Sequence, residues 1–143
     1  MRISKWLENS LPKLTGKRPV ARAAISEDDL VVCSEILVEM EELFVRHLCD
    51  LEIASVQQLR KALEAGNGSF LGLASGPLVW GGVGSISDVD LRCSGVHKES
   101  GREDDIKLRL LISRLGRIIL KSGVKSGRIE SLTEWYEAYD EEP

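Results

Sequence analysis

The sequence predicts an all-α fold, a small helical bundle with an irregular Gly-rich connection. Two segments, residues 26–48 and 103–121, repeat apolar residues at three- and four-residue steps, the period of a helix with one buried face. A glycine-rich stretch lies between them, from Ser69 to Leu91, and glycine weakens regular helices and strands. With 143 residues, 43% of them hydrophobic, the chain is long enough for one core and too short for two ordinary domains.

Helix 26–48 is expected to begin at Ser26, whose hydroxyl can cap the chain, with Asp29 three residues later as an acidic capping box. A second helix is expected from Ser55 to Gly66, since glycine favours a helix C-terminus. A short N-terminal helix through Ile3, Trp6 and Leu7 is expected before a basic linker.

Helix 103–121 opens with three acidic residues that suit the positive end of the helix dipole. Its predicted core stripe repeats at helical spacing and comprises Leu108, Leu111, Ile112, Leu115, Ile118 and Ile119. A last short helix is expected over residues 131–139. A short β-hairpin over residues 79–91 is the alternative for the Gly-rich connection.

Charge divides the chain into blocks. Residues 1–24, a basic helix and linker, carry a net charge of +5, whereas residues 25–64 carry −7. Residues 25–128 form the expected helical core domain, and the acidic aromatic tail of residues 129–143, with −6, packs on it or extends it. The whole chain has a net charge of −4, which gives no global attraction to nucleic acid or an anionic membrane.

The compartment follows from what the sequence lacks. No apolar run approaches the length of a membrane span, and no secretory signal pattern is recognisable, so we expect a cytoplasmic protein. The three cysteines, Cys33, Cys49 and Cys93, form no C-x-x-C pair, and reduced thiols are expected. No cofactor is expected.

The Gly-rich stretch contains Gly81-Gly82-Val83-Gly84-Ser85-Ile86-Ser87-Asp88-Val89-Asp90-Leu91. This segment resembles the GGMGSFNDLVL-type signature of a family of small, mostly helical bacterial proteins of unknown function, and the resemblance covers residues 50–122. Members look like solitary proteins encoded beside bacterial toxins. The resemblance therefore implies an immunity protein that neutralises a cognate toxin by direct binding, without enzymatic activity.

The residues of this motif also have a structural interpretation. Gly81, Gly82 and Gly84 permit a tight turn, in which Ser85 and Asp88 are expected to bond nearby backbone amides.

The same stretch is similar to the Gly-rich turn and Asp-x-Asp strand of minimal nucleotidyltransferases. Asp88 and Asp90, two residues apart on a strand, would share one face and could bind Mg²⁺. Against this enzyme, Pro77 stands where the family has a phosphate-binding Ser.

Two further alternatives are weaker. His47, Cys49, Cys93 and His97 could make a zinc set, although their spacing matches no common finger. The basic residues of 102–128 could bind nucleic acid.

Two acidic surfaces are candidates for binding a basic partner. One is the stripe of Glu35, Glu39 and Glu42 at helical spacing, where like charges destabilise the helix unless an opposite charge lies nearby. The other combines acids with aromatic anchors and comprises Glu134, Trp135, Tyr136, Tyr139 and Asp140. The alternative is internal pairing of both surfaces with Arg114, Arg117, Lys121 and Lys125.

Overall fold

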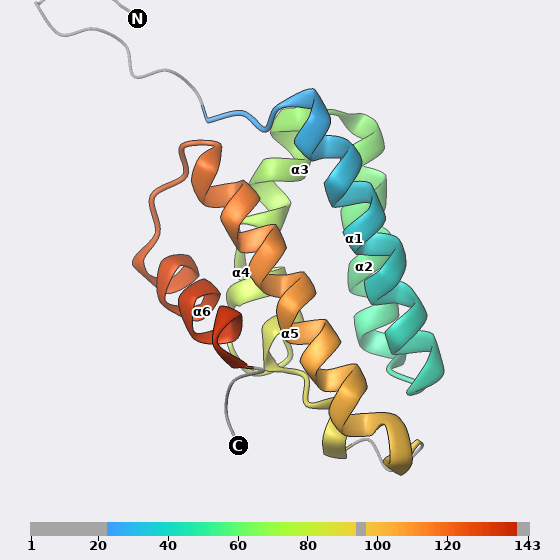
Figure 1. Cartoon of the computed structure of the whole chain (residues 1–143). Coiled ribbons are helices and arrows are strands. Elements are labelled where there is room, and N and C mark those ends of the chain that lie inside the picture. The colour runs from blue at the N-terminus through green and yellow to red at the C-terminus, as the bar shows by residue number, and fades with distance from the viewer. Residues whose placement is uncertain (1–22, 94–96, 140–143) are drawn as a thin grey trace, which may run out of the picture.

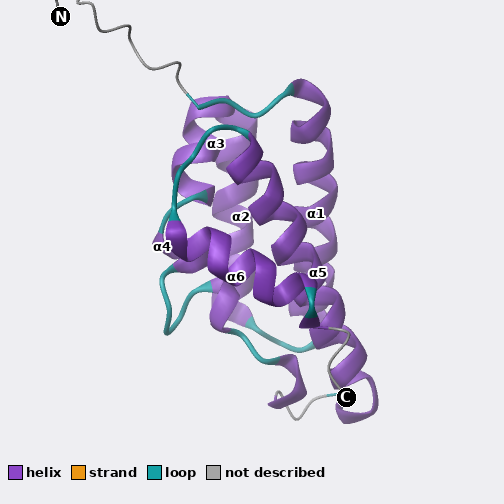
Figure 2. Cartoon of the chain, turned by 60° about the vertical axis from the view of Figure 1, so that its left-hand side comes forward, coloured by secondary structure: helices purple, strands orange, loops and turns teal. Residues whose placement is uncertain are grey.

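A computed structural model describes residues 23–93 and 97–139, which include all the principal helices expected from the sequence. The expected all-α fold is confirmed: the described residues contain helices and no strand (Figure 2). The hairpin alternative over residues 79–91 is therefore wrong. The predicted N-terminal helix through Ile3, Trp6 and Leu7 lies outside the described residues.

The first helix is α1, Glu27–Arg46, capped by the Ser26 hydroxyl, which accepts from the Asp29 amide at 3.2 Å, as predicted. Its core face is fully apolar and comprises Cys33, Ile36, Leu37, Met40, Leu43 and Phe44. The next helix, α2, spans Asp50–Ala65 and lies beside α1 (Figure 1). It begins five residues before the predicted Ser55, whose hydroxyl donates to the Leu51 carbonyl inside the helix.

The Gly-rich segment is more helical than predicted. Helix α3, Asn67–Ala74, packs against α2, and the single turn α4, Pro77–Trp80, follows it. Phe70 and Trp80 are buried, and the Trp80 indole donates to the Ala74 carbonyl at 2.8 Å. Burial of these side chains outweighs the cost of about 1 kcal/mol that each helical glycine adds.

Residues 81–93 are the irregular part of the connection. Gly82 and Gly84 have positive φ angles of 94° and 87°, so the predicted tight turn is present. Two short 3-10 turns follow, η1 at Ile86–Asp88 and η2 at Leu91–Cys93. Gly81 lies so close to Pro77 that any side chain there would collide with its backbone.

The longest helix, α5, Lys98–Lys121, contacts α1, η2 and the last helix, α6, Gly127–Glu137 (Figure 1). The predicted α5 stripe is buried in full and meets the core face of α1. Helices α5 and α6 approach closely at Gly116, where an added methyl group would overlap the Thr133 hydroxyl and lie 3.1 Å from the Trp80 ring. The absence of a side chain at residue 116 thus sets the spacing of the two helices.

We predict that Gly116→Ala lowers the free energy of unfolding by about 1–3 kcal/mol, because the extra methyl overpacks the α5–α6 contact. Gly72→Ala is the matched control: it also lies in a helix but has open space around it, so it should stabilise by about 0.5–1 kcal/mol. Urea unfolding measures both. Equal effects of the two substitutions would show that the contact does not set the spacing.

Candidate functional site

The predicted acidic stripe on α1 divides into two parts. Glu35 and Glu42 are exposed and form no ion pair within the described chain. Glu39 instead lies next to α5, where its Oε1 atom is 3.5 Å from the Lys107 ammonium. Glu39 therefore has the internal pairing that is the alternative to partner binding, with a lysine of α5 that the sequence analysis did not name, and the binding role of the stripe stays a prediction.

Apolar residues that the sequence analysis missed lie beside Glu35 and Glu42. Val31, Val38 and Val45 are 59%, 37% and 53% exposed, and their seven-residue spacing places them in one row on the outer side of α1. Asp28 lies seven residues before Glu35, so Asp28, Glu35 and Glu42 form an acidic row that runs parallel to the valine row. We define the α1 face as Asp28, Val31, Glu35, Val38, Glu42 and Val45.

Residues of the C-terminal half of the α1 face line a groove. Val38, Glu42 and Val45 line it, and its other lining residues are Glu41, Arg46 and Arg60. Those three residues form ion pairs within the protein: Arg60 with Glu41 at 2.6 Å, and Arg46 with Asp104 at 2.8 Å. The groove thus combines the apolar side chains of Val38 and Val45 with the Glu42 carboxylate, which has no ion pair in the described chain.

An exposed leucine in a strained conformation follows α1. Leu48 has φ of 57°, the left-handed region that costs a branched residue about 1–2 kcal/mol and that glycine adopts freely. Its side chain is 68% exposed, and it therefore contributes little to the core. The left-handed backbone closes the C-terminus of α1: the Leu48 amide donates to the Val45 carbonyl at 3.2 Å and the Cys49 amide to the Phe44 carbonyl at 2.9 Å, the bond pair of a Schellman C-cap. The fold therefore explains the conformation of Leu48 but not the choice of a leucine there.

The two tyrosines of the second predicted surface, in the C-terminal segment, make contacts inside the fold. Glu134 and Trp135 are exposed, but Tyr136 is buried, so its prediction as a surface anchor is wrong. Tyr139 is half-buried and donates to Asp105 at 2.7 Å. Asp140 lies outside the described residues.

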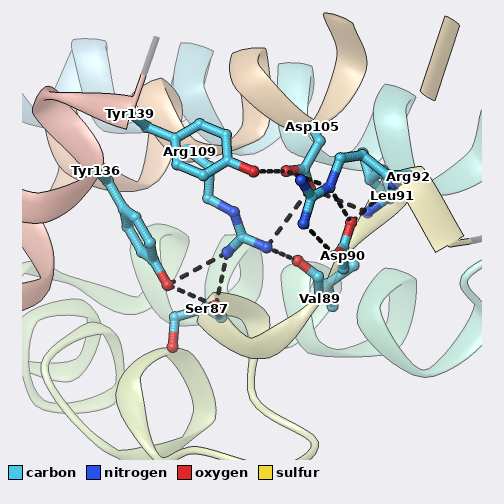
Figure 3. A network of polar contacts seen from close by, with 9 residues as sticks. All are labelled: Ser87, Val89, Asp90, Leu91, Arg92, Asp105, Arg109, Tyr136 and Tyr139. Carbon is cyan, nitrogen blue, oxygen red and sulfur yellow. Dashed lines mark hydrogen bonds and ion pairs between the residues drawn. The ribbon is translucent and has the colours of Figure 1, made fainter. Parts of the chain in front are cut away.

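Tyr136 and Tyr139 belong to a buried polar network around Arg109 (Figure 3). The Arg109 guanidinium donates to the Ser87 carbonyl at 2.7 Å and to the Val89 carbonyl, and it lies 3.5 Å from the Asp105 carboxylate. The Tyr136 hydroxyl donates to the same Ser87 carbonyl at 2.9 Å. Because a guanidinium has five N–H donors, one side chain can hold two carbonyls and a carboxylate together.

Asp105 fixes the other end of this network. Its Oδ1 atom accepts from the Leu91 amide at 3.0 Å, and the side chain is fully buried. Desolvation raises the pKa of Tyr136, and desolvation together with the Asp105 hydrogen bond raises that of Tyr139, so both phenols stay protonated near neutral pH. The network therefore joins α5, α6 and the Gly-rich connection, and it is structural.

Two side chains of the Gly-rich motif behave differently from the prediction. The Ser85 hydroxyl is buried 3.1 Å from the Ser87 hydroxyl, and the side chains of Ser85 and Asp88 cap no backbone amide. Backbone bonds close the turn instead, among them that from the Ser85 amide to the Gly82 carbonyl at 2.8 Å. The predicted bonds from backbone amides to the Ser85 and Asp88 side chains are wrong, because backbone carbonyls already accept from these amides: the Asp88 amide donates to the Ser85 carbonyl at 3.1 Å and the Val89 amide to the Ile86 carbonyl at 3.3 Å.

Asp88 and Asp90 lack the geometry that the nucleotidyltransferase alternative requires. Asp88 ends the 3-10 turn η1, so no strand presents the two carboxylates on one face. Asp90 forms an ion pair with Arg92 at 2.8 Å, and the hydrogen bond from that guanidinium lowers the pKa of Asp90.

The two histidines do come together, although not as a metal centre. The buried His47 ring lies edge-on to His97 with centroids 5.8 Å apart, and its Nε2 atom is 2.7 Å from Asp104. In the described part of the chain, no three His, Cys, Asp or Glu side chains are arranged to hold a metal, and the Cys93 side chain lies outside that part.

Burial, aided by the nearby Asp29 carboxylate, raises the pKa of the Cys33 thiol to about 12 and keeps the thiol protonated.

The comparisons with known proteins add no assignment. No family model matches the chain, and neither does any curated protein or solved structure. The family resemblance of the Gly-rich segment stays a prediction. Within the described residues, every helix is too short or too polar to cross a bilayer.

We predict that Arg109→Met lowers the free energy of unfolding by about 3–5 kcal/mol, because it removes the buried cation beside the Asp105 carboxylate, which keeps only the exposed Arg92 guanidinium at 3.9 Å, and removes a donor from the Ser87 and Val89 carbonyls. Arg114→Met is the matched control on the same helix, where the exposed arginine has no ion pair with a described residue, and it should change stability by less than about 0.5 kcal/mol. Chemical denaturation compares the two variants. Similar stabilities would exclude a structural role for the network.

We predict that Asp104 contributes to acid unfolding. Burial acts to raise its pKa, but the hydrogen bonds from His47 and Arg46 outweigh it and hold the pKa below the ordinary value of 3.8. The stability that Asp104 provides is therefore complete above pH 3.8 and is lost as the pH falls through the folded-state value. Asp104→Asn should make stability fall less steeply below about pH 4. An unchanged slope in denaturation curves across this range would contradict the assignment.

Proposed function

We propose that this protein is a non-enzymatic binding module that recognises another protein through the α1 face. The observation that carries the proposal is the row of three exposed valines beside carboxylates that have no ion pair in the described chain. Single exposed apolar residues need no explanation, but several on one helix face, beside these carboxylates, favour a protein interaction surface.

Leu48 supports the same surface. It follows Val45 by three residues, just past the end of α1, and its side chain is 68% exposed. Glycine is the usual residue at such a left-handed C-cap, so a leucine there adds exposed apolar surface close in the chain to the last valine of the row, at a cost in backbone strain. We include Leu48 in the proposed interface for this reason.

The finer form of the proposal is an immunity protein that neutralises a cognate bacterial toxin. It rests on the resemblance of the Gly-rich segment, whereas the α1 face supports binding to a protein of any activity. Trp135 and Glu134 on α6 are exposed and stay candidates for a second contact.

We predict that Leu48→Gly stabilises the protein by about 1 kcal/mol, since glycine relieves the left-handed strain, and at the same time weakens partner binding. Opposite effects on stability and binding would separate function from folding. Thermal unfolding measures the first effect. A loss of stability, or unchanged binding, would remove Leu48 from the interface.

The binding itself is tested by affinity capture with the tagged full chain, quantified by mass spectrometry. Proteins retained by the wild type should be lost with Val38→Asp and with Leu48→Gly. They should be kept by Val83→Ser, a control that changes a valine 98% exposed in the Gly-rich turn. Circular dichroism verifies that each variant is folded. Capture of the same proteins by all four chains would refute the α1 face as the binding surface.

A further inference from the structure

The spacing of the α1 face restricts the shape of what can cover it. The valine row repeats at 31, 38 and 45, and the acidic row repeats at 28, 35 and 42. Seven residues advance a helix by about 10.5 Å and leave it only about 20° short of two full turns, so both rows run almost parallel to the α1 axis. Each row spans 14 residue steps, from 31 to 45 and from 28 to 42, so a straight partner element can follow either row for about 21 Å.

We infer that the partner segment is a basic amphipathic α-helix that lies along α1, with apolar residues on the valine row and Lys or Arg beside the acidic row. This inference rests on the proposed function and specifies the chemistry of the partner. In α1 the valines occupy one position of each heptad. The positions where a full coiled-coil seam would have its second apolar residue hold Ser34, Glu35, Glu41 and Glu42. The partner helix therefore needs one apolar contact per heptad, against each valine, and the groove lined by Val38 and Val45 gives such a side chain a place to insert.

The basic character follows from which acids of α1 the protein neutralises itself. Those beside the neighbouring helices are all paired: Asp29 with Lys121 at 3.2 Å, Glu39 with Lys107 at 3.5 Å, and Glu41 with Arg60 at 2.6 Å. Glu35 and Glu42, on the outer side, have no described partner. Asp28 lies in the first turn, where the helix dipole already favours a carboxylate, so the argument depends on Glu35 and Glu42.

A second copy of the chain does not fit this surface. Two α1 faces packed along their valine rows would bring two acidic rows into one interface. Like charges placed opposite each other oppose association and direct the surface toward an oppositely charged partner. The observations therefore favour a heterologous basic helix.

The test uses the full chain and two designed helical peptides of about four heptads each, with leucines on the seam. One peptide has lysine at the flanking positions, and its twin has glutamate at the same positions. Fluorescence anisotropy measures both affinities at low and high salt. The wild type should bind the basic peptide at least about 10-fold more tightly than the acidic twin, and added salt should reduce that difference.

Two variants of the α1 face provide the specific controls. The exposed double variant Glu35→Lys/Glu42→Lys should reverse the preference toward the acidic twin. Val38→Asp should weaken binding of the basic peptide about 10-fold, because it replaces an apolar contact in the groove with a charged side chain. If Val38→Asp kept full affinity, the basic peptide would be attracted only by the overall negative charge of the protein, and the inference would be overturned.

Other outcomes also overturn the inference of a basic helix, and each can be told apart from a failure of the proposed function. If Val38→Asp loses the native partners in affinity capture but the wild type prefers neither peptide, the face binds proteins of another chemistry. If sedimentation shows a wild-type dimer that Val38→Asp dissociates, a second copy covers the face. If a peptide of residues 1–22 displaces the basic probe, the N-terminal segment of this chain is the occupant.

Discussion

The contact between Arg109 and the carbonyls of Ser87 and Val89 is the interaction on which the rest of the architecture depends. Residues 81–93 have no long helix or strand to satisfy their backbone, and buried carbonyls without donors would cost about 1–3 kcal/mol each. Arg109 supplies the donors from α5, and Asp105, one turn earlier, accepts from the Leu91 amide. Because Tyr136 also donates to Ser87, the same network determines how α6 lies on α5.

The helices α1 and α5 were predictable because each buries one stripe, and burial of that stripe produces a 3.6-residue period that the sequence displays. Helix α3 was not predictable, since Gly68 and Gly72 lower the intrinsic helix propensity of this segment. The burial of Phe70 that stabilises it depends on packing against α2. Propensity is local, but the packing that overrides it comes from other parts of the chain. The start of α2 was missed for a similar reason, since no side chain caps that helix.

The polar contacts were the least predictable feature. Arg109 belongs to a basic block that the sequence suggests is a surface, and its carbonyl partners lie 20 and 22 residues away. Tyr136 looked like an interface anchor because acids surround it, yet its hydroxyl reaches a carbonyl 49 residues earlier. The valine row, in contrast, left a signal in the sequence: three valines at seven-residue spacing, beside an acidic row with the same spacing.

Helix α1 is apolar on two sides, and only one of them is needed for folding. The core side fixes the helix through six buried residues, and ion pairs on both flanks, to Lys107 of α5 and Arg60 of α2, oppose rotation about its axis. The outer rows are thus held at a constant orientation before any partner arrives. A preorganised surface loses little conformational entropy on binding, which favours the use of these rows in the interface that we propose.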